Sequence, residues 1–351
     1  MSQTFPFRVA MTLLLALAAA LGCRALHTPI PWMIGPLSAT ALASITGRPT
    51  RSFAPLRNLG QWIIGTSLGL YFTPQVSALV ASRWWAILLA IAWALGLGWA
   101  SGRWLERRHG AEIGGSDQAR RATTWFAGAI GGASEMTLLA ERHGGRTELV
   151  AAAHSLRLLI VTLTVPFALT AVGLHGLDPS LPGAREVSMP GLALLLLASG
   201  GGAWLMTRTG RANPWFMGAL LAAMGLTMAG IELSAMPVWM SSTAQLLIGV
   251  SLGVRFSREF VHTAPRWLAS VAMATLGLVA VCAGFAWVLS KATGLHWATL
   301  VLGTSPGGIA EMSITAKVLQ LGVPVVTAFQ VCRLVAVLVL VEPLFRRGWL
   351  R

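Results

Sequence analysis

The chain is dominated by apolar runs that are each long enough to cross a bilayer. A membrane-crossing helix needs about 20 mostly apolar residues. Only 11% of the residues are charged, against about a quarter in a soluble domain. These features predict an all-α integral membrane protein and exclude an ordinary soluble globular fold. The ten runs cover 7–24, 31–47, 56–73, 84–103, 148–174, 190–207, 214–231, 240–256, 267–290 and 324–345.

Two further apolar stretches, 122–142 and 297–321, are interrupted by a glycine pair that a glutamate follows. Glycine pairs permit a broken helix and a close approach of the backbone. Such a segment either returns to the side it entered, as a re-entrant hairpin, or crosses as a hinged helix. The sequence leaves these two alternatives, and therefore the number of full crossings, open.

The sequence contains an internal duplication. Blocks of the first half recur in the same order in the second half, at offsets between 176 and 184 residues. Blocks that recur in the same order in both halves of a chain predict two structural repeats. The matched blocks are Pro31–Gly35 with Pro214–Gly218, Gly65–Gly69 with Gly249–Gly253, Trp84 with Trp267, Gly131–Met136 with Gly307–Met312, and Arg157 with Arg333.

The duplication defines the expected domains. Residues 1–174 form the first membrane repeat, residues 190–351 form the second, and 175–189 link them on the outside. The run at 7–24 has some features of a signal peptide. Its counterpart at 190–207 favours a helix of the mature protein instead.

The positive charges predict how the two halves face. The chain has 26 Lys and Arg against 12 Asp and Glu, a net charge of +14, and cations that flank spans mark the cytoplasmic side. If the glycine-broken segments return to the side they entered, 19 of the 26 cations lie inside. If they crossed fully, the second half would have reversed polarity. We therefore expect two inverted repeats, each of about five transmembrane helices plus one glycine-broken or re-entrant segment. Both termini are expected in the cytoplasm of a bacterial cell, at the inner membrane.

The glycine-broken segments carry the first group of candidate site residues. A half-helix that begins after the break has free N–H groups and a positive dipole end, which can hold an anion or a polar ligand. A glutamate near this end is a candidate for coupling a proton or a cation. The candidates are Gly131, Gly132, Ser134 and Glu135 in the first segment, and Gly307, Gly308 and Glu311 in the second.

The last helix of each half carries the second group. Arg157 and Arg333 lie about ten residues into these helices, where a charge costs several kcal/mol unless it is paired or hydrated. His154 and Gln330 precede the arginines by three residues, which places each pair on one helix face. A structural alternative is that each arginine only pairs with the glutamate of its half and locks the fold. For His154, packing in the helix bundle is an equal alternative.

These blocks resemble the AbrB-duplication membrane family, whose members carry the labels ammonia monooxygenase and AbrB-type regulator. The resemblance rests on a Pro-Gly-Gly-x-Ser/Ala-Glu-Met block, present as Pro306–Met312 and, without its proline, as Ile130–Met136. The helix order is also similar to the cation/proton antiporter and anion transporter superfamily. That similarity implies a transporter-like core with crossed broken helices. Nothing resembles the small soluble DNA-binding regulator that shares the family name.

From these features we expect a secondary transporter of a small polar or anionic solute, coupled to a proton or cation gradient. Its partners would be the lipid bilayer and the solute or ion, with no direct contact to nucleic acid, and a homo-oligomer is left open. The alternative is a membrane-bound regulator or sensor that affects the regulation of gene expression indirectly. The longest predicted cytoplasmic loop, 104–121, is too short for a DNA-binding domain.

We expect no enzymatic activity, no cofactor and no metal. A copper or iron oxygenase needs clustered histidine and carboxylate ligands. Of the seven histidines, only His154 lies well inside a predicted span, and none is paired at ligand spacing. The ammonia monooxygenase label is therefore disfavoured.

Overall fold

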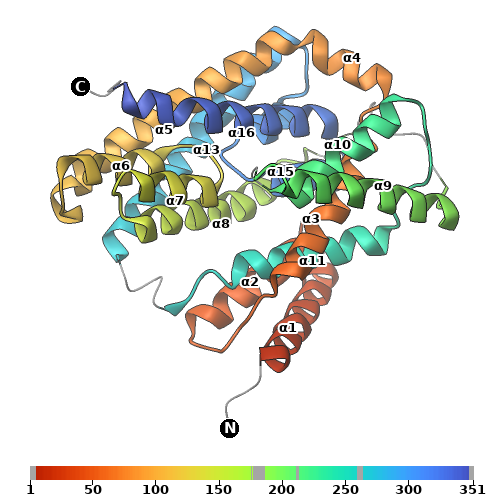
Figure 1. Cartoon of the computed structure of the whole chain (residues 1–351), viewed down its shortest axis with the longest axis horizontal. Helices are drawn as coiled ribbons and strands as arrows, with labels where there is room; N and C mark the ends of the chain where they lie inside the picture. The colour runs from red at the N-terminus through yellow and green to blue at the C-terminus, as the bar shows by residue number, and fades with distance from the viewer. Residues whose placement is uncertain (1–4, 175, 177–185, 211–212, 259–263, 348–351) are drawn as a thin grey trace. The chain divides into compact units, whose positions relative to one another are not determined.

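The computed structural model describes residues 5–174, 176, 186–210, 213–258 and 264–347, and all regular structure in them is helical (Figure 1). The helices are α1 (Phe5–Ala25), α2 (Pro31–Ile45), α3 (Ala54–Gly69), α4 (Pro74–Ser82), α5 (Trp84–Ile113), α6 (Asp117–Gly128), α7 (Ala133–Arg142), α8 (Thr147–Ala171), α9 (Met189–Thr207), α10 (Pro214–Met228), α11 (Val238–Gly253), α13 (Pro265–Thr293), α14 (Trp297–Thr304), α15 (Ile309–Val318) and α16 (Val323–Arg346). Most of the linker predicted at 175–189 falls outside the described residues.

The order of helices follows the duplication. Helices α2 and α10 both have 15 residues, α3 and α11 both have 16, and α7 and α15 both have 10. The residue before α2, Ile30, and the residue before α10, Asn213, both adopt the left-handed conformation, with φ of 47°. A proline follows each of them. Equivalent segments of the two halves therefore fold alike, down to an uncommon backbone geometry.

In the described ranges, six helices are long and apolar enough to cross a membrane: α1, α5, α8, α9, α13 and α16. The chain is thus a helical, multi-pass membrane protein. Helices α3 and α4 meet at a bend of 88° and make a seventh span only if they are counted together. The runs predicted at 31–47, 56–73, 214–231 and 240–256 form helices of 15 or 16 residues. At 1.5 Å per residue these are about 24 Å long, which is less than the ~30 Å hydrocarbon core.

The four short helices lie in the first of two compact units, which comprises Met1–Ser82, Pro166–Val261 and Ser313–Pro324. Here α3 packs against α10, and α2 packs against α11. Many side chains of α11 are buried by protein. Hydropathy alone cannot distinguish burial by protein from burial by lipid, so these runs look like full spans in the sequence.

Glycines allow the short helices to approach closely. A Cβ atom on Gly65 of α3 would lie 2.4 Å from the backbone oxygen of Phe216 on α10. A Cβ atom on Gly249 of α11 would lie 2.7 Å from the backbone oxygen of Met33 on α2. Carbon and oxygen atoms do not approach so closely without a bond, so only glycine fits. The two contacts are equivalent under the duplication.

The second compact unit comprises Arg83–Val165, His262–Met312 and Val325–Arg351. Helix α5 packs against α6 and α13, and α13 packs against α14. Two indole N–H groups join its helices by hydrogen bonds of 3.2 Å, from Trp125 to the Val341 carbonyl and from Trp267 to the Leu149 carbonyl. This unit contains both glycine pairs and the start of the half-helix that follows each.

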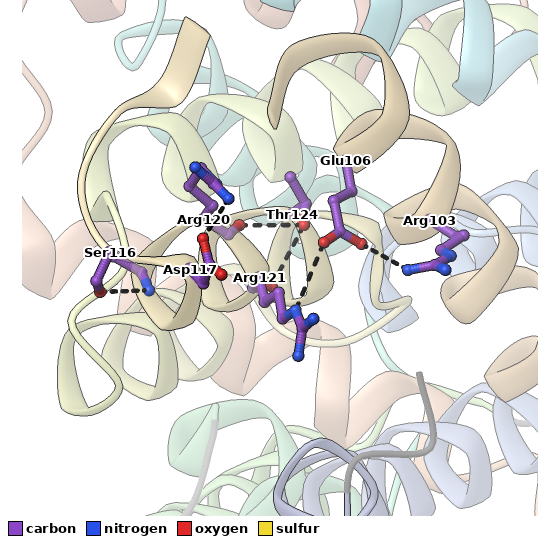
Figure 2. Close-up of polar contacts among 8 residues, drawn as sticks. Arg103, Glu106, Ser116, Asp117, Arg120, Arg121 and Thr124 are labelled. Atoms are coloured by element: carbon purple, nitrogen blue, oxygen red, sulfur yellow. Dashed lines mark hydrogen bonds and ion pairs between the residues drawn. The ribbon is translucent and has the colours of Figure 1, made fainter. Parts of the chain in front are cut away.

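The chain enters the first broken segment through a short corner between α5 and α6. The Ser116 side chain caps α6 by accepting a hydrogen bond from a backbone N–H of its first turn. Glu106 of α5 forms ion pairs with Arg103, at 3.2 Å, and with Arg121 of α6, at 3.8 Å (Figure 2). The segment 104–121, predicted as a loop, is therefore mostly helix. A helix that leaves the bilayer becomes polar on its exposed faces, which hides it from an analysis of apolar runs.

Candidate functional site

Each glycine-broken segment consists of two half-helices joined by a short stretch of extended backbone. Helix α6 ends at Gly128 and α7 begins at Ala133, while α14 ends at Thr304 and α15 begins at Ile309. Gly132, the residue that precedes α7, has φ of −70° and ψ of 136°, which is an extended conformation. The breaks therefore lie at the glycine pairs. The candidate residues near them all belong to the second unit.

In the first half, α8 holds the end of α6 through backbone carbonyl groups. The guanidinium of Arg157 donates hydrogen bonds to the carbonyl of Ala129, at 2.7 Å, and to that of Ala127. His154, one turn earlier, donates from Nε2 to the carbonyl of Phe126, at 2.8 Å. Both side chains are buried. His154 thus acts with Arg157 on the same helix end.

The second half repeats this arrangement. The guanidinium of Arg333 on α16 donates to the carbonyls of Ser305 and Gly307, the latter at 2.8 Å. It also donates to the side chain of Gln330, at 2.6 Å. Gln330 in turn donates to the carbonyl of Leu302, at 2.7 Å. Ser305 is equivalent to Ala129 and Leu302 to Phe126, with glutamine in the place of histidine, whereas the second carbonyl, that of Gly307, lies beyond the position equivalent to Ala127.

The arginines therefore cap the C-terminal ends of α6 and α14. The last carbonyl groups of a helix lack donors within the helix and carry the negative end of its dipole. A buried guanidinium satisfies them and is itself stabilised by them. In the described part of the chain, no ion pair joins Glu135 to Arg157. The alternative in which this pair locks the fold is thus not what the structure contains, because backbone carbonyls take up the arginine.

The glutamates lie at the opposite ends, where α7 and α15 begin. A Cβ atom on Gly132 would be 2.0 Å from Oε2 of Glu135, and one on Gly308 would be 2.0 Å from Oε2 of Glu311. Each carboxylate therefore folds back over the second glycine of its pair. Glu311 is buried and Glu135 is half-buried. The positive dipole end that could hold a solute anion is adjacent to the chain's own carboxylate.

Each break also packs against the last helix of the other half. The Cβ position of Gly132 lies 3.7 Å from the side chain of Leu334 on α16, and that of Gly308 lies 3.3 Å from Leu158 on α8. The two leucines directly follow the capping arginines in sequence. Each break is thus held by the arginine of its own half and contacts the leucine of the other half.

The remaining residues of the repeated block have packing roles. A Cβ atom on Gly131 would approach Met136 to 3.0 Å, and one on Gly307 would approach Met312 to 2.8 Å. Both methionines are fully buried. The methionine side chain therefore occupies the space next to the first glycine of each pair, and the glutamate side chain occupies the space next to the second. Ser134 is exposed at the second position of α7.

One polar residue was not among the predicted site residues. Lys317 lies in the last turn of α15. Its ammonium group donates to the hydroxyl oxygens of Ser67, at 2.6 Å, and Ser241, at 3.3 Å, within the first unit. The equivalent residue of the first half is Glu141, with the opposite charge. This reversal at a repeated position is a signal that could have drawn attention to Lys317.

Comparison with known proteins matches the chain over nearly its whole length. The family model described as "Transition state regulatory protein AbrB" covers residues 32–348. A protein of Bacillus subtilis (strain 168) named "Uncharacterized protein YhjN" is 26% identical over 341 residues, covering 90% of this chain and 87% of the relative. A protein of Escherichia coli (strain K12) named "Putative regulator AbrB" is 27% identical over 335 residues, covering 93% and 92%.

Proposed function

We propose that this chain, which belongs to the AbrB family, is a secondary transporter of the bacterial inner membrane. The solute would be small and polar or anionic, and its movement would be coupled to a proton or a cation. The observation that carries the proposal is the pair of equivalent broken helices, each with a carboxylate at the start of its second half. Broken helices that present half-helix ends to a ligand are a common feature of secondary transporters.

In the proposed mechanism, the glutamates and the solute compete for the same positions. With Glu135 and Glu311 ionised, each carboxylate stabilises the start of a half-helix. Protonation removes that negative charge, and the exposed dipole end then favours an anionic group of the solute. Binding of the solute and of the proton are thus coupled at each break.

The arginines would act as positioning residues. Arg157 and Arg333 use their terminal amino groups to hold the preceding half-helices. Their Nε–H groups are buried and have no hydrogen-bond partner in the part of the chain that the structure describes. A buried donor without an acceptor is unfavourable. An acceptor group of the solute, or a water molecule that accompanies it, would supply the missing partner in both halves.

The proposal includes the inverted orientation of the two repeats, with both termini in the cytoplasm. It is supported by the distribution of positive charges, because the opposite orientation would place the arginine-rich loops of the second half outside. Reporter fusions after Arg108 and at Ser180 test it. We expect reports from opposite sides of the membrane, and reports from the same side would exclude the inverted arrangement.

Transport itself is tested with purified protein. A thermal-shift screen of small anions and polar solutes selects ligands, and uptake into proteoliposomes is then measured under an imposed proton or sodium gradient. We expect Glu311→Gln to abolish gradient-dependent uptake. The matched control is Glu148→Gln, which removes an exposed carboxylate from an ion pair with Arg146. The proposal is refuted if no solute is moved and Glu311→Gln responds to every ligand as the unchanged protein does.

A second candidate function comes from the name of the relative in Escherichia coli, which is called a regulator. We propose that any effect on the regulation of gene expression is indirect and follows from transport. In a deletion strain, restoration of normal expression by a transport-dead Glu311→Gln variant would favour a direct sensor instead. The chain is not proposed to be an enzyme. Metal analysis of the purified protein tests this against the ammonia monooxygenase label.

A further inference from the structure

The first unit contains a cavity of about 580 Å³, and the charged residues among its described lining are all positive. None of the described residues that line it is an aspartate or a glutamate. Five of the lining residues are arginines, and several others carry a hydroxyl group. The arginines are Arg8, Arg48, Arg51, Arg57 and Arg255.

The arginines reach this cavity from distant parts of the sequence. Arg8 lies in α1, Arg48 and Arg51 lie between α2 and α3, Arg57 lies in the first turn of α3, and Arg255 follows α11. Positive charges gathered around one hollow repel one another and attract a negatively charged group. A preference for positive charge on the cytoplasmic side explains arginines at many places around the loops, but it does not explain their convergence on one hollow.

Two of the arginines have donor groups that are left over. The Nε–H groups of Arg8 and Arg57 are buried and have no hydrogen-bond partner among the described residues. Helix α3 also begins here, at Ala54, which lines the cavity, and it has no side-chain cap. Guanidinium donors of several arginines that gather beside a helix start form a set that an acceptor-rich anion can satisfy.

We propose that this arginine pocket binds an anion that carries one or more phosphate groups. The planar fork of a guanidinium matches two phosphate oxygens at once, and this geometry is the reason that arginine recognises phosphate so often. The volume lies within the range of small-ligand pockets, about 300–1,000 Å³. The Ser52 hydroxyl also lines the cavity, as do the hydroxyls of Ser44 and Thr50, which are hydrogen-bonded to each other.

This inference does not depend on the proposed transport at the broken helices, because its residues all belong to the first unit. The phosphate chemistry has two sources, a phospholipid headgroup and a soluble phosphorylated compound. The test separates them. In one arm, delipidated protein in detergent is titrated with pyrophosphate by calorimetry. In the other, retention of cardiolipin and of phosphatidylcholine on the purified protein is measured by native mass spectrometry.

The pocket variant is Arg48→Gln with Arg51→Gln, since both residues are exposed and their loss leaves the core intact. The matched control is Arg107→Gln with Arg347→Gln. It removes two exposed arginines that do not line the cavity. We expect the pocket variant to weaken binding by about tenfold or more, as loss of charge-assisted hydrogen bonds implies. The control is expected to retain the original affinity.

The outcomes assign the source or overturn the proposal. Binding of pyrophosphate that only the pocket variant weakens indicates a soluble ligand. Selective retention of cardiolipin, lost only in the pocket variant, indicates a lipid headgroup. The proposal is overturned if neither probe binds, or if the control variant weakens binding as much as the pocket variant does. Arg57→Gln serves as a second, independent pocket variant.

Discussion

Replacement of Arg333 by methionine tests whether the buried arginines hold the broken helices together. The change removes two charge-assisted hydrogen bonds to the carbonyls of Ser305 and Gly307 and one to the side chain of Gln330. A hydrogen bond to a charged group contributes about 1.5–3 kcal/mol. Loss of the two carbonyl bonds therefore costs about 3–6 kcal/mol before compensation.

Part of this cost is recovered, because the methionine variant no longer has to bury a charge. We expect a net loss of about 2–4 kcal/mol, which lowers the melting temperature by about 3–5 °C in a chain of this size. The assay is thermal unfolding of detergent-purified protein, followed by tryptophan fluorescence. Arg157→Met, at the equivalent position, is expected to lose a similar amount. Arg347→Met, at an exposed position, is the control.

A lysine at position 333 sharpens the test. Its ammonium group keeps the charge but cannot reproduce the fork of the guanidinium. We therefore expect Arg333→Lys to recover only part of the stability. The capping role is refuted if Arg333→Met unfolds at the same temperature as the exposed control. It is also refuted if the lysine variant is fully stable while the methionine variant is not, because charge alone would then suffice.

Three further variants give simpler tests by the same melting assay. Gly308→Ala places a methyl group 2.0 Å from a carboxylate oxygen and should lower the free energy of unfolding by about 1–3 kcal/mol. Gly277→Ala, with open space around the glycine, is the control and should be neutral or slightly stabilising. Equal effects of the two variants would contradict the close contact. Ser67→Ala removes the nearer acceptor of the Lys317 ammonium and should lower the free energy of unfolding by about 1–3 kcal/mol. The same change should cost much less in a chain that already carries Lys317→Met. Additive costs of the two changes would refute an interaction between Ser67 and Lys317. Ser116→Ala removes the cap of α6 and should cost about 1 kcal/mol, and no change would mean that the cap is dispensable.

Much of the helical architecture could be predicted from the sequence, because the signals are local. Apolar runs mark helices, glycine pairs mark the breaks, and the repeated blocks relate equivalent helices. Hydropathy did not reveal which apolar runs form helices of only 15 or 16 residues, since burial against protein and against lipid select the same residues. It also missed the polar end of α5 beyond the apolar run.

The site residues illustrate the same limit. The sequence singled out Arg157 and Glu135 as polar residues in apolar surroundings, and a mutual ion pair was the simplest structural alternative. The structure instead pairs the arginine with backbone carbonyls. Backbone groups at a helix break are the same for every sequence, so residue identities do not reveal them as partners. Lys317 was missed because its serine partners lie some 250 and 76 residues away in the chain.

Each break has an arginine at the end of its first half-helix and a glutamate at the start of its second. These two groups differ in how their charge can change. A guanidinium keeps its positive charge at any physiological pH, whereas a carboxylate can become neutral. With both glutamates ionised, the four buried or half-buried groups of the two breaks sum to zero. Each proton taken up alone would leave one uncompensated positive charge in a medium of low dielectric constant, which is costly. If protons drive transport here, each should therefore move with one negative charge of the solute, and the cycle should be electrically silent and insensitive to membrane voltage.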